Sequence, residues 1–160
     1  MKDEKSIGRA REDALRLLSH RLRSRNEVED RLARRGWPSD VIERVLSGLE
    51  RAGLIDDERF VRLWVDERMR LRPRGIALLR QELRRKGISE EVIEKTLREQ
   101  EHGSDELARA RELLQRRQHQ YKGLDPQAAR RRMAGFLARR GFDGETVYTA
   151  VRQILREEKE

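Results

Sequence analysis

The sequence contains no cysteine, only three prolines and few aromatic residues, which make up 4% of its 160 residues. Without cysteine the chain can form neither disulfides nor a thiolate site, and this composition suits a reducing compartment. No apolar run approaches the roughly 18 residues that span a bilayer, and the charged N-terminus lacks the apolar core of a signal peptide. We therefore expect a cytoplasmic protein with no membrane partner.

The alternation of apolar and polar residues that is typical of strands is also missing, whereas Arg, Glu, Leu and Ala are abundant. Only 36% of the residues are apolar and 42% are charged, which is too little apolar material for one deep core in a chain of this length. Small units that each bury a modest face against their neighbours fit this composition better. The composition therefore predicts an all-α, elongated repeat protein.

One short pattern occurs three times, with a leucine, a basic pair directly before a glycine, and then a large apolar residue. The copies are Leu32–Trp37, Leu83–Ile88 and Leu137–Phe142. Their glycines lie 51 and 54 residues apart, a spacing typical of tandem structural units. A basic helix end followed by glycine predicts a helix that stops in the left-handed conformation. We expect three three-helix repeats, about nine helices in all, over residues 8–53, 54–103 and 104–158.

Capping residues place the remaining helix starts. Ser24 and Glu27 have the spacing of a capping box, which predicts that the second helix of the first repeat begins there. Arg72–Pro73 and Asp125–Pro126 predict the starts of the equivalent helices in the second and third repeats, because proline is favoured in the first helical turn. The first helices of the three repeats are expected over residues 8–22, 57–71 and 105–120.

No group of residues suggests catalysis or metal binding. His20, His102 and His119 are scattered, and no phosphate-binding loop or nucleophile motif is present. Asp56 and Asp57 could in principle hold a divalent ion, but they stand where a helix begins, and capping explains them better. We expect a non-enzymatic protein with no metal and no cofactor.

Basic residues are concentrated in bands within a chain of net charge +8. Residues 68–86 contain eight basic residues against Glu82 alone. On a helix that follows Pro73, Arg74 and Arg85 would differ by only about 20° in direction and would lie opposite the apolar face. Such clusters suit phosphates or an acidic protein surface, and the alternative is ordinary solvated surface joined by ion pairs.

The residues expected to contact a partner or phosphate are basic side chains of the first two repeats. They are Arg21, Arg23, Arg25, Arg34, Arg35, Arg68, Arg70, Arg72, Arg74, Arg84, Arg85 and Lys86. A third cluster comprises Arg130, Arg131, Arg132, Arg139 and Arg140. Because aromatic residues are few, a contact with nucleic acid should involve the backbone and not base stacking.

Three segments, 53–60, 74–76 and 80–88, resemble the RecX family of recombination regulators. The resemblance implies a curved array of three-helix repeats that binds the RecA recombinase filament on single-stranded DNA and inhibits its ATPase, strand-exchange and coprotease activities. It implies a cytoplasmic protein, which we expect to be a monomer with weak affinity for single-stranded DNA outside the filament. The first two repeats resemble the family best and are expected to carry most of the recognition. The family-motif residues expected to be largely structural are Asp56, Asp57, Phe60, Gly36 and Gly87.

Two other functions remain open from the sequence. The basic bands would also suit a helical protein that binds nucleic acid without sequence preference and has no RecA partner, and steep salt dependence would distinguish it. The uniform repeats would suit a general helical adaptor, although the positive bands argue against that function.

Overall fold

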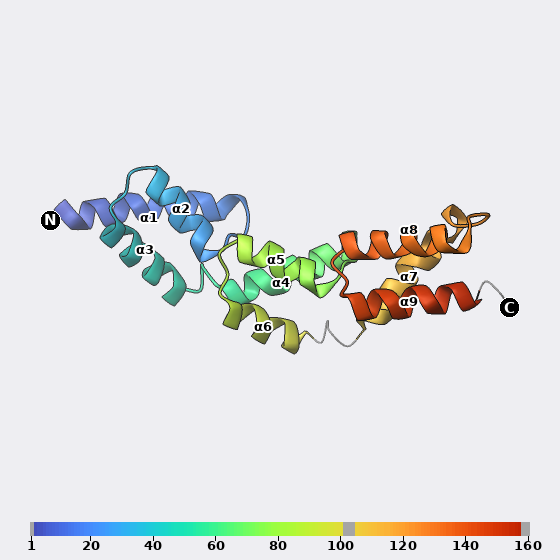
Figure 1. The fold of residues 1–160 in the computed structure, drawn as a ribbon. Coiled ribbons are helices and arrows are strands. Elements are labelled where there is room, and N and C mark those ends of the chain that lie inside the picture. The colour runs from blue at the N-terminus through green and yellow to red at the C-terminus, as the bar shows by residue number, and fades with distance from the viewer. Residues whose placement is uncertain (1, 101–104, 158–160) are drawn as a thin grey trace. The chain divides into compact units, whose positions relative to one another are not determined.

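The computed structural model describes residues 2–100 and 105–157, and within these ranges it contains helices and no strand (Figure 1). The all-α prediction is confirmed. The helices are α1 Lys2–His20, α2 Arg25–Arg34, α3 Ser39–Arg51, α4 Asp57–Leu71, α5 Ile76–Arg85, α6 Glu90–Glu99, α7 Glu106–Arg116, the short 3₁₀ helix η1 Gln118–Gln120, α8 Pro126–Arg139 and α9 Gly144–Glu157. His102 and the expected repeat boundaries at residues 103–104 and 158 lie outside the described residues.

The chain divides into two compact units. Unit 1 comprises the described residues up to Leu63 together with Leu83–Thr96, and unit 2 comprises Trp64–Glu82 and the described residues from Leu97 onward. Helices α1–α3 therefore belong to unit 1 and α7–α9 to unit 2. Each of α4, α5 and α6 contributes one part to unit 1 and another to unit 2, so the middle triplet does not form a compact unit of its own.

Each unit contains a core built from its own helix triplet. In unit 1, α1 packs on α3 and α2, and its buried residues are Ala10, Ala14, Leu17, Val28, Leu32, Val41, Ile42, Val45, Leu46, Leu49 and Ile55. In unit 2, α9 packs on α7 and α8 around residues that include Leu113, Leu114, Met133, Phe136, Leu137, Val151 and Ile154. The leucine that opens each copy of the repeated pattern is fully buried, and truncating such a leucine to alanine costs about 2–5 kcal/mol.

The repeated glycines end their helices as predicted. Gly36, Gly87 and Gly141 have φ of 85°, 73° and 85°. In each copy the glycine N–H bonds back to a carbonyl three residues earlier, and the next N–H bonds to the carbonyl of the opening leucine, for example Trp37 N to Leu32 O at 3.3 Å. These paired bonds satisfy carbonyls that the end of a helix leaves open. The prediction of glycine-stopped helices is confirmed.

Two of the three predicted starts of second helices are confirmed. Ser24 and Glu27 form a reciprocal capping box at α2, in which the Ser24 side chain accepts from the Glu27 N–H and the Glu27 side chain accepts from the Ser24 N–H. Asp125 caps α8 by accepting from the N–H groups of Gln127 and Ala128, and Pro126 occupies the first helical position. Both starts depend on neighbours in the sequence, which is why the pattern predicts them.

The third predicted start, at Arg72–Pro73, is wrong, because α5 begins at Ile76. The Gly75 N–H donates to the Arg140 carbonyl at 2.7 Å, and the Ile76 N–H donates to Glu106 Oε1 at 2.6 Å. These bonds to distant segments take the donors that an earlier helical turn would have used. Arg74 is therefore not on α5, and its predicted place beside Arg85 on one helical face is also wrong.

Candidate functional site

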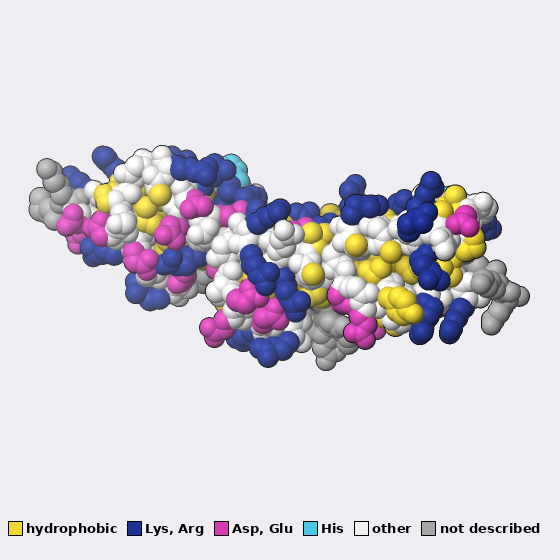
Figure 2. Space-filling view, viewed as in Figure 1, with side chains coloured by type: hydrophobic (Ala, Val, Ile, Leu, Met, Phe, Trp, Pro, Cys, Tyr) yellow, Lys and Arg dark blue, Asp and Glu magenta, His cyan; other side chains and the backbone are white. Residues whose placement is uncertain are grey.

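The candidate site consists of basic side chains, which have different neighbours in the two units. On the face shown in Figure 2, the Lys and Arg side chains over α1–α3 alternate with Asp and Glu, whereas those over α8 and α9 border hydrophobic side chains. An arginine whose charge is balanced by a carboxylate of the same chain attracts a binding partner less strongly than an unpaired arginine does. The ion pairs within the chain therefore decide which of the predicted residues are available.

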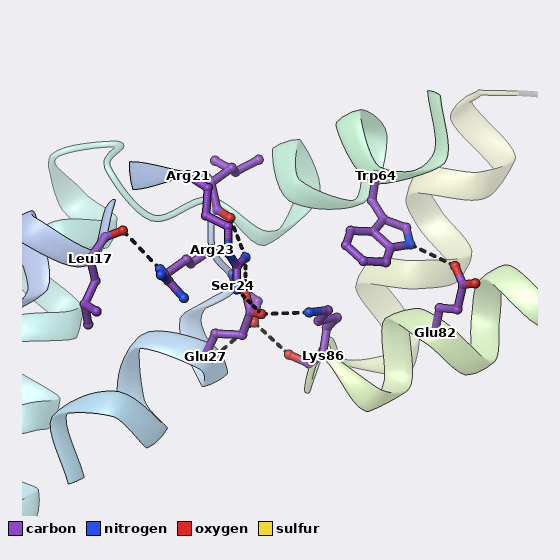
Figure 3. A network of polar contacts seen from close by, with 9 residues as sticks. Leu17, Arg21, Arg23, Ser24, Glu27, Trp64, Glu82 and Lys86 are labelled. Carbon is purple, nitrogen blue, oxygen red and sulfur yellow. Dashed lines mark hydrogen bonds and ion pairs between the residues drawn. The ribbon is translucent and has the colours of Figure 1, made fainter. Parts of the chain in front are cut away.

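A carboxylate in unit 1, Glu27, holds two of the predicted residues (Figure 3). Glu27 pairs with Arg21 at 3.0 Å and with Lys86 Nζ at 2.9 Å, and it accepts the Ser24 N–H at 3.1 Å. Burial alone would raise the pKa of the Glu27 carboxyl, but these three hydrogen bonds outweigh it and lower the pKa to about 2. The Glu27 carboxylate thus links α2 to Lys86, which lies 59 positions later in the chain.

Arg23, also in this region, is a structural residue. It is only 9% exposed, and its Nε donates to the Leu17 carbonyl at 3.0 Å (Figure 3). Burial and the neighbouring charge of Arg21 lower the pKa of the Arg23 guanidinium. A side chain in this position supports the turn between α1 and α2 and offers little surface to a partner.

In unit 2, Glu82 holds two further predicted residues. It pairs with Arg74 and lies 3.8 Å from Arg68. It also accepts the indole N–H of Trp64 at 3.1 Å (Figure 3). The Arg68 guanidinium also lies 4.2 Å from the centre of the Trp64 ring, which is a cation–π contact. The Arg68 Nε is buried and has no hydrogen-bond acceptor, since Glu82 lies beyond hydrogen-bond distance.

Seven of the twelve basic residues predicted in the first two repeats form ion pairs within the chain, and an eighth, Arg23, is buried. The seven are Arg21, Arg25, Arg35, Arg68, Arg74, Arg84 and Lys86. The remaining four, Arg34, Arg70, Arg72 and Arg85, are exposed and have no carboxylate partner in the described part of the chain. The structure therefore brings most of the predicted cluster together with acids and leaves four side chains available.

The third cluster differs, because Arg130, Arg131, Arg132 and Arg139 are all exposed and none has a carboxylate partner among residues 2–100 and 105–157. Arg140, the fifth member, is partly buried next to other arginines. Burial and the like charges of Arg72, Arg74 and Arg117 lower the pKa of its guanidinium. Unit 2 thus carries four exposed arginines that have no carboxylate partner in the described ranges.

The acidic motif between α3 and α4 is structural. Asp56 accepts the Arg59 N–H at 3.1 Å, so the predicted capping role is confirmed. Asp57 has a second role that the sequence did not predict, because its Oδ1 accepts the N–H of Arg25 at 2.9 Å and so caps α2. Ile55 and Phe60 are both buried. Within the described ranges, no three His, Asp or Glu side chains gather as metal ligands, and no helix is long and apolar enough to cross a membrane.

Asp57 belongs to a joint that occurs twice in the chain. In unit 1 the Ser24 hydroxyl donates to the Lys86 carbonyl at 2.7 Å, while the Arg25 N–H donates to Asp57. In unit 2 the Gly75 N–H donates to the Arg140 carbonyl, while the Ile76 N–H donates to Glu106. Gly75 and Ile76 lie 51 positions after their equivalents Ser24 and Arg25, and Arg140 lies 54 positions after its equivalent Lys86. The two acceptor carboxylates, of Asp57 and Glu106, belong to the first residues of α4 and α7.

The glycines of the repeated pattern make room for these joints. A Cβ on Gly87 would lie 2.3 Å from the Asn26 side chain, and a Cβ on Gly141 would lie 2.2 Å from Leu78 Cβ. Gly36 has nothing within 4 Å of that position. The family-motif glycines therefore stop a helix in every repeat, and in two of them they also let the preceding repeat approach.

Comparison with known proteins gives a consistent match. Three family models, described as the first, second and third three-helix domains of RecX, match residues 10–49, 56–97 and 104–151. The chain is 37% identical to "Regulatory protein RecX" of Amycolatopsis mediterranei over 154 residues, which cover 96% of this chain and 87% of the relative. It is 39% identical to the protein of the same name from Mycolicibacterium smegmatis over 155 residues, which cover 94% and 82%. The crystal structure of RecX from Lactobacillus salivarius is 23% identical, has a TM-score of 0.85, and covers 94% of this chain and 97% of that chain.

Proposed function

The chain belongs to the RecX family of regulatory proteins, and from this premise we propose that it binds the RecA recombinase filament on single-stranded DNA and inhibits RecA. The activities restrained are ATP hydrolysis, strand exchange and coprotease activity. The observation that carries the proposal is the match of all three RecX domains, in order, along this one chain. The protein acts in the cytoplasm as a monomer, without a cofactor and without catalysis of its own.

Among the basic residues of the predicted clusters, the four that are exposed and have no carboxylate partner in the described ranges are the proposed contacts in the first two repeats. Arg34, Arg70, Arg72 and Arg85 each present a planar guanidinium that can bind a carboxylate or a phosphate with two hydrogen bonds. The paired residues hold the helices in place and contribute little net charge. Three domains that contact successive RecA protomers would together bind more tightly than any one of them, without one tight site, provided that the spacing lets them bind at the same time.

One observation favours a second function, which is binding to nucleic acid without RecA. The arginines of α8 have no carboxylate partners in the described ranges, as a surface for a polyanion requires. The two functions differ in their readout, because a protein of the second kind would bind a bare strand and leave RecA's ATP hydrolysis unchanged.

The proposal is tested by titrating the protein into RecA filaments formed on single-stranded DNA and following ATP hydrolysis and filament length. We expect hydrolysis to fall as the protein is added. No change in either quantity would reject the proposed function.

A matched pair of variants locates the contact. Charge reversal to glutamate at Arg34, Arg70, Arg72 and Arg85 should weaken inhibition at least tenfold, whereas reversal at four other exposed arginines should not. The control set is Arg31, Arg44, Arg51 and Arg59, which are also exposed but are not among the residues predicted as contacts. Both variants carry the same net charge, so an equal reduction of inhibition in the two would show that only total charge matters and would reject these four arginines as the binding residues.

A further inference from the structure

The third repeat contains a basic pocket that the sequence pattern did not reveal. The pocket has a volume of about 560 Å³ and lies between the end of α7 with η1 and one face of α8. Its lining includes Arg117, Arg131, Arg132, Arg139, Tyr121 and Phe136. No acidic residue lines it. The third arginine cluster predicted from the sequence contains three of these arginines but neither Arg117 nor Tyr121.

The pocket has hydrogen-bond donors in excess of acceptors. The guanidinium of Arg117 donates to Gln120 Oε1 at 2.6 Å and lies 4.3 Å from the centre of the Phe136 ring, which fixes its orientation. Its Nε is buried and has no acceptor, and the same is true of the Tyr121 hydroxyl, on a residue only 5% exposed. A buried donor without an acceptor is unfavourable, so an acceptor-rich ligand that a small shift of these side chains could reach would be favoured.

The periodicity of α8 arranges the arginines in a row. Residues 131, 135 and 139 are four apart and therefore lie on one face of the helix. The middle position is Gly135, where an added Cβ would lie 3.1 Å from Arg139 Nη1. The glycine thus leaves the floor of the pocket open between two arginines, whose Cα atoms are about 12 Å apart along the helix.

We propose that this pocket binds consecutive phosphates of a nucleic-acid strand. Guanidinium groups match phosphate oxygens in geometry and charge. A row of about 12 Å is longer than a single phosphate group, so it suits successive phosphates along a strand better than one isolated anion. This inference deepens the proposed function by naming one contact with the DNA of the filament, and it predicts binding to a bare strand as well.

The sharpest test changes the charge of the pocket floor at constant size. Gly135→Glu supplies the carboxylate that the pocket lacks, four residues from both Arg131 and Arg139, whereas Gly135→Gln adds a side chain of the same size without charge. Both variants should fold, because either residue favours a helix over glycine and the flexible end of Arg139 can move aside. Binding of the full chain to a fluorescent oligothymidylate is measured by anisotropy at several salt concentrations.

Gly135→Gln fills part of the open floor without adding charge, so we expect a modest loss of affinity relative to the wild type and an unchanged salt slope, and this variant is the reference for Gly135→Glu. Gly135→Glu should bind at least tenfold more weakly, and the slope of log affinity against log salt should fall in magnitude by about 0.7 for each phosphate that the pocket no longer neutralises. A triple change of Arg131, Arg132 and Arg139 to lysine should keep most of the slope, because the charge remains, while affinity falls. Equal affinities and slopes for Gly135→Glu and Gly135→Gln would overturn the inference.

Two competitors test whether another anionic ligand, and not a nucleic-acid strand, binds in the pocket. If inorganic phosphate displaces the strand at an equal concentration of phosphate groups, the pocket binds single anions. If poly-glutamate displaces the strand, the occupant is an acidic protein. Either result overturns the assignment of the pocket to a nucleic-acid strand. The RecA titration is a separate experiment. Failure of the wild type to inhibit RecA would reject the proposed function and leave the pocket standing, whereas loss of the Glu–Gln difference would reject the pocket and leave inhibition standing.

Discussion

The first and third repeats share one helical plan but use their arginines differently. In the first, Arg25 pairs with Glu43 at 2.8 Å and Arg35 pairs with Asp13 at 2.6 Å, so the charges stabilise the unit in which they lie. In the third, Arg131 and Arg132 have no acid to pair with in the described chain. The difference shows that the number of basic residues in a repeat does not measure what it offers to a partner, because pairing within the chain decides that.

The repeated glycines give a second comparison and the largest expected effect. Gly141→Ala should destabilise the protein by about 3 kcal/mol or more, because alanine is strained at φ of 85° and its Cβ would overlap Leu78. Gly36→Ala has the same strain but open space, so about 1–2 kcal/mol is expected. Urea denaturation of the full chain measures both, and equal destabilisation by the two would contradict the role of Gly141 in the joint.

Acid should destabilise unit 1 through Glu27. The pKa of this carboxyl is about 2 in the folded chain against an ordinary value of 4.5, so its contribution is fully present above about pH 4.5 and is lost as the pH falls toward 2. We expect the free energy of unfolding to fall by about 2 kcal/mol over this range. Trp37, the tryptophan of unit 1, reports unfolding in a Trp64→Phe background.

The control for this prediction is Glu27→Gln in the same background, which removes the titrating group. It should be less stable at pH 7 and should show a weaker dependence on pH between about 4.5 and 2. An unchanged pH profile in this variant would mean that Glu27 does not anchor the network.

The stability of the joint between Arg25 and Asp57 in unit 1 should depend on the hydrogen-bond acceptor of Asp57 and not on its negative charge. Burial raises the pKa of the Asp57 carboxyl despite the bond from the Arg25 N–H, so at neutral pH the charged form is the costly one. Asp57→Asn keeps an acceptor and should change the free energy of unfolding by less than about 0.5 kcal/mol, whereas Asp57→Ala should cost about 1–2 kcal/mol. Equal destabilisation by the two variants at pH 7 would show that the charge itself is needed.

The smallest effect is expected from an exposed ion pair. Arg84 and Glu90 lie 2.7 Å apart but are both more than half exposed, so a double-mutant cycle should give a coupling of less than about 0.5 kcal/mol. Arg132→Ala, which breaks no pair, should leave stability unchanged or slightly raised. A coupling above about 1 kcal/mol at physiological salt would show that exposed pairs matter more than this comparison assumes.

The sequence predicts what neighbours in the chain decide. The capping box at Ser24 and the helix stop at Gly36 depend on residues within one turn, and both predictions are confirmed. The start of α5 depends on Arg140 and on Glu106, which lies 30 residues from Ile76, and that prediction is wrong. Local patterns carry no information on such bonds.

The sequence allows ion pairing as an alternative, but it does not identify the partners that lie far away along the chain. The partner of Lys86 lies 59 residues away, and that of Arg25 lies 18 residues away on another helix. A basic band in the sequence therefore predicts charge density but not available charge. The sequence pattern grouped the arginines of α8 that line the basic pocket. It did not include Arg117, which comes close to them only in the folded chain.

The most direct test of this difference compares two triple variants in the RecA assay on single-stranded DNA. One changes Arg131, Arg132 and Arg139 to alanine, and the other changes Arg21, Arg25 and Arg35 to alanine, so that both lose three positive charges. We predict that the third-repeat variant stays folded and inhibits ATP hydrolysis more weakly than the wild type, because one contact with the strand is lost, whereas the first-repeat variant is less stable but inhibits like the wild type when folded. Equal inhibition by the third-repeat variant and the wild type would contradict the account.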